Sequence, residues 1–259
     1  DGYRYTQSAD GTTWTSPQSV KFPFDTTGAL PTLVAGPAKG LIYVFFQTKD
    51  KSLRFAQANS EILGEPASWA FQGSISVDVL AYHVAMDAQG WLHIAYIRNK
   101  DNNVLGPAGV YYSRSTDEGR SWSTEKFLYG SQYFRNTKPE SAHIRVAVSD
   151  EPGNERIHVV WDNTFLKRIF MSTSTNSGQN WGEAVQLKGP EATGGYDMPF
   201  NAEVRINGQS SLLLWEVGEP GANQCNLYGQ WSEDGGDTWG GTDIVLGARS
   251  VCPISIDFL

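Results

Sequence analysis

A short phrase of serine, aspartate or asparagine, glycine and tryptophan recurs along this chain, and it limits the possible folds more than any other feature. The phrase is complete at residues 115–122 and 232–239, carries Asn176 in place of the aspartate at residues 174–181, and is one residue shorter at residues 8–14. A phrase that returns at wide intervals indicates a fold made of copies of one structural unit. We therefore expect a repeat architecture.

The tryptophans that end the phrases set the length of the unit. Trp122, Trp181 and Trp239 follow one another at intervals of 59 and 58 residues. Trp14 precedes the first of them by 108 residues, which is close to two such intervals. A fifth, degenerate copy is therefore expected near the midpoint, where residues 58–69 keep a serine, a glycine and a final tryptophan. The 259 residues thus predict five units.

The sequence between the phrases is typical of β-strands. It contains short apolar runs that are rich in β-branched and aromatic residues and are bounded by Gly, Pro, Asn and Asp. No stretch carries the 3.6-residue apolar stripe of a long helix. First strands are expected at residues 32–35, 83–86, 145–148 and 203–206, and second strands at residues 41–46, 92–96, 157–161 and 212–215. A third strand leads into each phrase, as at residues 109–114 and 168–172, and a fourth follows, as at residues 125–128 and 184–187. Four antiparallel strands per unit, repeated radially, predict an all-β fold of the β-propeller type.

The phrase S-x-D-x-G-x-T/S-W resembles the Asp-box (BNR) repeat of the sialidase/neuraminidase-like propeller superfamily, and the resemblance covers the whole chain. It implies five or six four-stranded antiparallel blades in a single domain, residues 1–259, with the Asp-box turns between the third and fourth strands. Residues 3–6 look like a third strand and residues 252–258 like a first strand. We therefore expect either a shared closing blade that is one strand short or a fragment that lacks part of one blade.

The residues of the phrase are expected to be structural. An Asp or Asn next to glycine suits a tight turn in which the side chain caps backbone N–H groups, and the tryptophan ring is expected to be buried beneath that turn. Each turn offers one or two oxygens, fewer than calcium requires, so no metal or other cofactor is predicted. The predicted structural set is Asp10, Asp117, Asn176, Asp234, Trp14, Trp69, Trp122, Trp181 and Trp239.

Charge and cysteine content narrow the compartment and the partners. A net charge of −8 and a pI near 5.0 argue against nucleic acid, whose phosphates require a basic face. No apolar run long enough to span a membrane occurs, and the chain begins at Asp1 without a signal peptide, which fits a processed extracellular or cell-surface protein or a piece of a longer one. Cys225 and Cys252 fall in loops on one face of neighbouring units, so a disulfide and two separate buried thiols both remain open.

Candidate functional residues gather on the face opposite the repeated turns, where second strands end and first strands begin. Loops on a rigid scaffold commonly carry binding residues. This rim mixes aromatic side chains with forked polar groups, a combination suited to a polyhydroxylated ligand. The predicted substrate-binding residues are Arg145, Arg205, Arg98, His83, His143, Asn201, Trp161 and Trp215. In contrast, His93 and His158 are expected in the core with satisfied hydrogen bonds.

Asp162 and Glu216 occupy equivalent positions on adjacent units and favour a glycosidase interpretation, one carboxyl as general acid and the other as base or nucleophile. The alternative is that each caps its own loop or pairs with Arg145 or Arg205. The resemblance implies an arginine triad and a Tyr–Glu nucleophile pair, and Tyr82 completes the candidate catalytic set. However, the Phe/Tyr-Arg-Ile-Pro segment of sialidases is absent, so no catalytic residue carries over by motif.

These features predict an extracellular propeller that recognises carbohydrate or a glycoconjugate on its loop-rich face. Two alternatives stay open: an exo-acting glycoside hydrolase of the sialidase type, and a non-catalytic scaffold that binds another protein. Among the connecting segments, 130–139 is the candidate for a lid or partner contact because it is longer than its counterparts, but the sequence favours an ordinary Ω-loop packed by Tyr133 and Phe134.

Overall fold

The computed structural model describes residues 4–20, 31–38, 40–59, 69–149, 151, 153–163, 165–188, 199–218, 225–240 and 244–249. The chain divides into two compact units, Asp1–Val77 and Asp78–Leu259. Nearly all regular structure in the described part is β-strand, with short 3-10 helices η3 (Gln132–Asn136) and η4 (Pro139–Ser141). No helix in these ranges has the length and hydropathy needed to cross a membrane.

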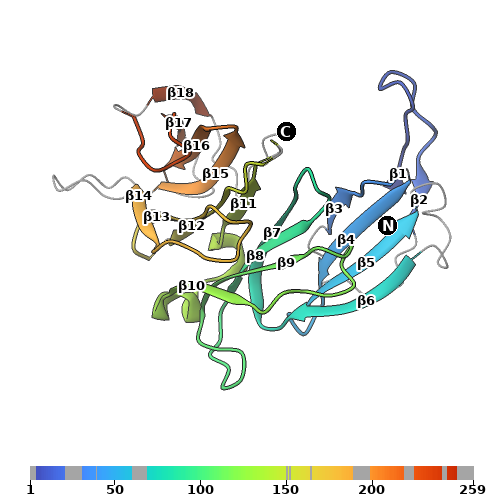
Figure 1. Cartoon of the computed structure of the whole chain (residues 1–259), viewed down its shortest axis with the longest axis horizontal. Helices are drawn as coiled ribbons and strands as arrows, with labels where there is room; N and C mark the ends of the chain where they lie inside the picture. The colour runs from blue at the N-terminus through green and yellow to red at the C-terminus, as the bar shows by residue number, and fades with distance from the viewer. Residues whose placement is uncertain are drawn as a thin grey trace. The chain divides into compact units, whose positions relative to one another are not determined.

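The first unit contains a four-stranded and a two-stranded antiparallel sheet (Figure 1). The larger sheet runs in chain order through β3 (Thr32–Ala35), β4 (Leu41–Gln47), β5 (Leu53–Asn59) and β6 (Trp69–Ser76). In the smaller sheet, β1 (Arg4–Tyr5) pairs with β2 (Gln18–Ser19) across the first copy of the phrase.

The second unit contains three four-stranded antiparallel sheets, each again in chain order. The first sheet is β7 (Val79–Met86), β8 (Leu92–Arg98), β9 (Gly109–Ser115) and β10 (Lys126–Gly130). The second is β11 (Ile144–Val148), β12 (Ile157–Asn163), β13 (Arg168–Ser174) and β14 (Val185–Lys188). The third is β15 (Pro199–Asn207), β16 (Ser210–Val217), β17 (Cys225–Ser232) and β18 (Ile244–Arg249).

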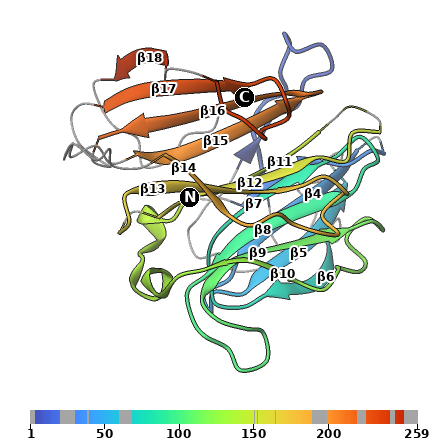
Figure 2. The same cartoon turned by 60° about the vertical axis from the view of Figure 1, so that its left-hand side comes forward.

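The three sheets of the second unit meet along their first strands, because β11 contacts both β7 and β15 (Figures 1 and 2). This confirms the predicted all-β architecture of four-stranded antiparallel sheets. The number of blades and the single-domain organisation stay predictions, and residues 252–258 lie outside the described ranges.

Burial on both faces explains why the second strands read as continuous apolar runs. Side chains alternate between the two faces of a strand, so Val159 and Trp161 of β12 pack in one core cluster with residues of the preceding sheet. Val160 faces the other way and packs with Trp215 of the following sheet. Each such large apolar side chain contributes about 1.5–3 kcal/mol to the free energy of unfolding.

Three copies of the phrase form turns between third and fourth strands with the same hydrogen bonds. The serine hydroxyl accepts the N–H of Gly119 at 2.7 Å, of Gly178 at 2.9 Å and of Gly236 at 2.7 Å. The side-chain oxygens of Asp117, Asn176 and Asp234 each accept a later backbone N–H of the turn, at 2.9, 2.8 and 2.8 Å. Asp10 likewise accepts the N–H groups of residues 12 and 13, at 2.8 and 2.7 Å. The acid or amide therefore caps the turn, as its chemistry predicts.

The expected burial of the tryptophan rings is found only in part. Trp122, Trp181 and Trp239 are half-buried, and Trp69 is buried where it opens β6, whereas Trp14 is 60% exposed. The expectation is thus wrong for Trp14, because the two-stranded β1–β2 sheet offers little surface to cover its ring. The turn that would precede Trp69 falls in residues 60–68, outside the described ranges.

Candidate functional site

Four polar side chains meet at the rim of the second unit, where second strands end and first strands begin. We call His143, Asp162, Asn201 and Glu216 the rim cluster; each is less than 8% exposed. The ring nitrogen Nδ1 of His143 lies 2.8 Å from Asp162 Oδ2, and its backbone N–H donates to Asp162 Oδ1 at 3.2 Å. Asn201 donates its backbone N–H to Asp162 at 2.9 Å and its side-chain amide to Glu216 at 3.1 Å. The cluster thus joins the second and third sheets.

A local irregularity of β15 brings the cluster together. The pairing of β15 with β16 shifts register between Phe200 and Glu203, and Asn201, inside that shift, has a φ of 51°. Asparagine tolerates this left-handed conformation better than most residues. The distortion directs both the backbone and the side chain of Asn201 at carboxylates, and strained backbone of this kind concentrates at functional sites.

The hydrogen bonds of Asp162 determine how His143 is oriented. The Nδ1 nitrogen of His143 faces Asp162 Oδ2, and this contact fixes the orientation of the imidazole ring. The cost of burying this carboxylate is offset by three N–H donors, two on His143 and one on Asn201. Of the pair, only the His143 side chain retains any exposure, at 8%. His143 is therefore the member of the pair that lies nearer the surface.

A second set of polar side chains lies on the first strands β7, β11 and β15 of the three sheets. We call its members, His83, Arg145, Glu203 and Arg205, the inner cluster. Arg145 Nε donates to the buried carboxylate of Glu203 at 2.7 Å, and Arg205 donates to its other oxygen. His83 Nδ1 accepts the N–H of Val146 at 3.2 Å. Burial, together with the charges of Arg145 and Arg205, lowers the pKa of His83 to about 3. His83 is therefore neutral at physiological pH.

Arg98 does not join the other two arginines. Its side chain is wholly buried, donates to both oxygens of Glu125 at 2.9 and 2.8 Å and to the carbonyl of Leu105 at 2.7 Å, and lies over the ring of Tyr111 at 4.2 Å. This geometry holds the first sheet together and leaves no guanidinium edge for a substrate. Tyr82 pairs with Tyr96 across β7 and β8, and because it follows strand alternation it faces away from its neighbour His83.

The two aromatic residues expected to stack on a sugar lie in the core instead. Trp161 is 0% and Trp215 is 2% exposed; Trp161 stacks on Phe170 and Trp215 on Tyr228. They follow strand alternation into the spaces between sheets, so their ring faces are covered by protein. The structure therefore does not support their assignment to substrate binding.

The two histidines assigned to the core are confirmed there. His93 contacts the hydroxyl of Tyr112 at 2.7 Å and Asp87 at 3.0 Å. His158 contacts Thr173 and Ser211 at 2.9 and 3.2 Å. Cys225 is buried at the start of β17, but the predicted disulfide involves Cys252, which lies outside the described residues.

A pocket of about 340 Å³ opens at the rim end of the second sheet. Its lining residues are Asn136, Thr137, Lys138, Ser141 and Phe165. Four of these belong to the β10–β11 connection that contains the predicted contact segment 130–139. Phe165 was missed in the sequence because it stands in a short turn outside the aligned strands; the only signal was a large aromatic residue in a polar turn.

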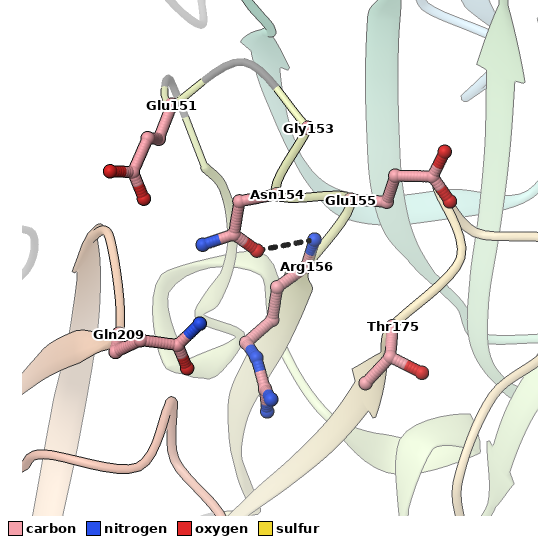
Figure 3. A pocket seen from close by; sticks show the side chains of 7 residues that line it. All are labelled: Glu151, Gly153, Asn154, Glu155, Arg156, Thr175 and Gln209. Atoms are coloured by element: carbon pink, nitrogen blue, oxygen red, sulfur yellow. Dashed lines mark hydrogen bonds between the residues drawn. The ribbon is translucent and has the colours of Figure 1, made fainter.

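A second pocket, of about 400 Å³, lies at the opposite end, between the β11–β12 turn and neighbouring turns (Figure 3). Glu151 and Glu155 lie on opposite sides of it, and Asn154 accepts the backbone N–H of Arg156 at 3.2 Å. The Arg156 guanidinium donates to the carbonyl of Gly235 at 2.7 Å. These side chains connect turns of adjacent sheets. Among the described residues no group of three or more His, Cys, Asp or Glu side chains is arranged to hold a metal ion.

Comparison with protein-family models finds no match, and comparison with curated protein sequences finds none either. Solved structures do resemble the chain. A polysaccharide lyase, an ulvan lyase bound to a glucuronate–sulfated rhamnose unit, aligns with a TM-score of 0.51 at 11% identity over 92% of this chain and 76% of its own. The α-L-arabinofuranosidase Arb93A of Fusarium graminearum, in complex with an iminosugar inhibitor, aligns with a TM-score of 0.56 at 10% identity over 82% of this chain and 64% of its own.

A protein of unknown function from Dyadobacter fermentans aligns with a TM-score of 0.53 at 16% identity, over 81% of this chain and 66% of its own. Identities this low show the fold alone. The chain has a β-propeller fold, of the kind also found in enzymes that act on carbohydrate.

Proposed function

We propose that the protein processes carbohydrate at the rim of the Asp78–Leu259 unit, with His143 as the proton-transfer group and Asp162 as its positioning residue. The observation that carries the proposal is the 2.8 Å contact between His143 Nδ1 and Asp162 Oδ2. A carboxylate that orients an imidazole through one of its nitrogens is a recurring arrangement in general acid–base catalysis. The fold likeness to an ulvan lyase and an arabinofuranosidase supports carbohydrate as the substrate class.

This assignment changes the role of the two carboxylates. Asp162 is 2% and Glu216 0% exposed, so neither oxygen pair is placed for direct contact with a sugar ring. Instead, Asn201 links the two carboxylates beneath His143. In hydrolysis, His143 Nε2 would take a proton from the water that bonds to the anomeric carbon as the glycosidic C–O bond breaks, and would then return that proton to the leaving oxygen. In an elimination it would take the proton from the sugar carbon beside the one that carries the leaving oxygen; a C=C bond forms as the C–O bond breaks, and the same proton passes from His143 to the leaving oxygen.

The proposal extends to the family and the location of the protein. We infer that the repeated turns are Asp-boxes of the sialidase-like superfamily, which the shared serine–glycine and aspartate–backbone hydrogen bonds support. We also propose an extracellular or cell-surface location, which would give the protein access to the polysaccharides of cell walls and extracellular matrices.

Sialidase-type hydrolysis is a second candidate because Arg145 and Arg205 lie together, and paired guanidinium groups bind carboxylates. Both, however, donate to Glu203, so a substrate carboxylate would compete with it. Turnover of a fluorogenic sialoside that is abolished by Arg145→Ala would favour this candidate. Turnover of other glycans, with no turnover of the sialoside, would favour carbohydrate processing by His143.

The test of the proposal compares turnover across a panel of polysaccharides, measured as new reducing ends or as ultraviolet absorbance from elimination. We expect His143→Gln and Asp162→Asn to lower kcat by about 10²–10⁴-fold, the usual contribution of general acid–base catalysis. The matched control is His93→Gln, which breaks the other buried His–Asp contact, at 3.0 Å, and should lower stability but not turnover per folded molecule.

Full activity of His143→Gln in folded protein would refute the assignment of His143. A wild-type protein that leaves every polysaccharide intact and binds none would refute carbohydrate processing. Co-purification with a protein partner under those conditions would favour the scaffold alternative.

A further inference from the structure

We propose that Tyr133 and Phe165 form an aromatic platform beside the rim pocket and that, with Lys138, they bind an anionic glycan. The inference rests on the proposed function and names its substrate class. The two rings stack at a centroid distance of 5.6 Å and an interplanar angle of 15°. Tyr133 is 37% and Phe165 54% exposed. Flat aromatic faces held at the surface offer the apolar side of a sugar ring a packing surface.

The platform is held in place by the segment that carries it. Phe134, the neighbour of Tyr133, is 1% exposed and packs edge-on against Tyr129 at 6.3 Å. Ser131 accepts the N–H of Tyr133 at 3.3 Å and the side-chain amide of Asn163 at 3.3 Å. The helix η3 is therefore anchored both to the core and to the end of β12. A binding surface ordered in advance avoids the entropy cost of immobilising its side chains.

A second tie fixes the outer side of the same segment. The Arg135 guanidinium pairs with both carboxylate oxygens of Asp101, in the β8–β9 connection, at 3.0 and 3.1 Å. Thr137 Oγ1 donates to the carbonyl of Tyr133 at 2.9 Å. With η3 held on both sides, Tyr133 is directed outward toward Phe165.

The adjoining pocket has the size and chemistry of a sugar subsite. Its volume of about 340 Å³ falls in the range of small-molecule sites. Phe165 belongs to both the platform and the pocket, and Asn136, Thr137 and Ser141 add amide and hydroxyl groups that can bind sugar hydroxyls. Stacking on one side and hydrogen bonding on the other is the combination that a pyranose requires.

Lys138 determines the charge of the ligand. It is exposed in the pocket lining and makes no ion pair among the residues the structure describes. The chain carries a net charge of −8, so a cation at the pocket stands out against an acidic background. An ammonium group binds carboxylate or sulfate by charge-assisted hydrogen bonds. The chemistry favours a uronate or sulfated sugar, and the two are distinguished by the test.

The test measures the binding of defined oligosaccharides by titration calorimetry: oligogalacturonate, hyaluronan and sulfated galactan fragments, each beside a neutral oligosaccharide of equal length. We expect Phe165→Ala to weaken the binding of an anionic oligosaccharide by about 10-fold. Lys138→Gln should weaken it by about 5-fold and reduce its salt dependence. A preference for the sulfated or the uronate fragments identifies the anion.

Matched controls lie on the outer strand β10. The exposed fraction of Phe127, 51%, is similar to the 54% of Phe165, and Lys126 is exposed as Lys138 is. Both controls lie outside the pocket lining, so Phe127→Ala and Lys126→Gln should bind as the wild type does. The Tm of each variant shows that it is folded. Tyr133→Ala provides a second platform variant, with an expected loss in the same direction.

The outcomes separate this inference from the proposed function. If a glycan is processed but Phe165→Ala and Lys138→Gln bind it as tightly as the wild type, the platform is refuted and carbohydrate processing stands. If only neutral glycans bind, the anionic specificity is refuted. If no glycan is bound or processed, both proposals fail.

Discussion

At the residue scale, buried histidines are the most informative titratable groups of the second unit. His158 is 0% exposed, and its ring nitrogens contact the hydroxyls of Thr173 and Ser211. Burial, and next the charge of Arg156, lower its pKa to about 4. Folding therefore favours the neutral imidazole.

This shift predicts the pH dependence of stability. The unfolded chain protonates His158 near its ordinary pKa of about 6.5, whereas the folded chain resists until a pH of about 4. The contribution of His158 to stability is therefore complete above pH 6.5 and is lost as the pH falls toward 4, by up to about 1.4 kcal/mol per pH unit. Urea unfolding at several pH values should show this slope.

The variant His158→Gln keeps a polar side chain at this position without the titration. Between pH 6.5 and 5 its stability should depend less on pH than that of the wild type, even if it is less stable throughout. Equal slopes for the two proteins would show that the pKa of His158 is the same in the folded and unfolded states.

The limits of sequence reasoning are also clearest at single residues. The alignment of strands predicted that His83, Arg145 and Glu203 share one level and that His143 and Asn201 share another. In the structure Arg145 pairs with Glu203, and His83 bonds the backbone next to Arg145. His143 and Asn201 are joined through Asp162. Trp161 and Trp215 were placed one position from Asp162 and Glu216, yet alternation sends them into the core. Whether a given side chain is buried between sheets depends on how the neighbouring sheets pack, and the sequence of one strand does not determine this packing.

At the scale of elements, regular strands were predictable and distorted ones were not. The predicted second strand 157–161 is β12, Ile157–Asn163, because its apolar run and bounding turn are both local. The predicted first strand 203–206 is the longer β15, Pro199–Asn207. The sequence predicted Asn201 as a site residue but not the register shift around it, because the carboxylate of Asp162 that bonds its backbone is distant in the chain.

Two turn glycines of similar conformation, Gly236 and Gly153, are expected to differ in how much an alanine substitution lowers the free energy of unfolding. Gly236 has a φ of 88°, and a Cβ there would lie 2.8 Å from His158 Cε1; Gly153 has a φ of 85° and no atom within 4 Å of its would-be Cβ. We expect Gly153→Ala to cost about 1–2 kcal/mol of unfolding free energy, from the left-handed backbone alone. Gly236→Ala should cost about 1–3 kcal/mol more, because of overpacking.

Chemical denaturation of both variants measures this difference. Equal losses would mean that the turn does not press on β12. The pair separates backbone strain from packing, since the conformational cost is shared.

At the scale of the whole molecule, the sheets of the second unit are joined by arginines as well as by apolar contacts. Arg114 of β9 donates to the carbonyl of Ser177 in the next turn, and Arg156 donates to the carbonyl of Gly235 at 2.7 Å and pairs with Asp237 at 3.1 Å. Trp181 also packs on Tyr112 of the preceding sheet, with ring centroids 4.7 Å apart. The turns at residues 174–181 and 232–239 thus each contact the sheet before them.

We predict that Arg156→Met lowers the free energy of unfolding by about 1–3 kcal/mol, because it leaves a carbonyl between sheets without its donor. The control is Arg120→Met, whose side chain is 71% exposed and pairs only within its own turn, with Glu118 at 3.2 Å. That change should be near neutral. Similar Tm values for both variants would show that the joint at Gly235 adds nothing.

The middle sheet of the unit, β11–β14, both receives a bond from its predecessor, at Ser177, and extends one to its successor, from Arg156. This one sheet therefore carries both an acceptor for the preceding sheet, the Ser177 carbonyl, and a donor to the following sheet, the Arg156 guanidinium. A tandem copy inserted beside it would carry the groups for both contacts, so it could attach on either side without a new interface.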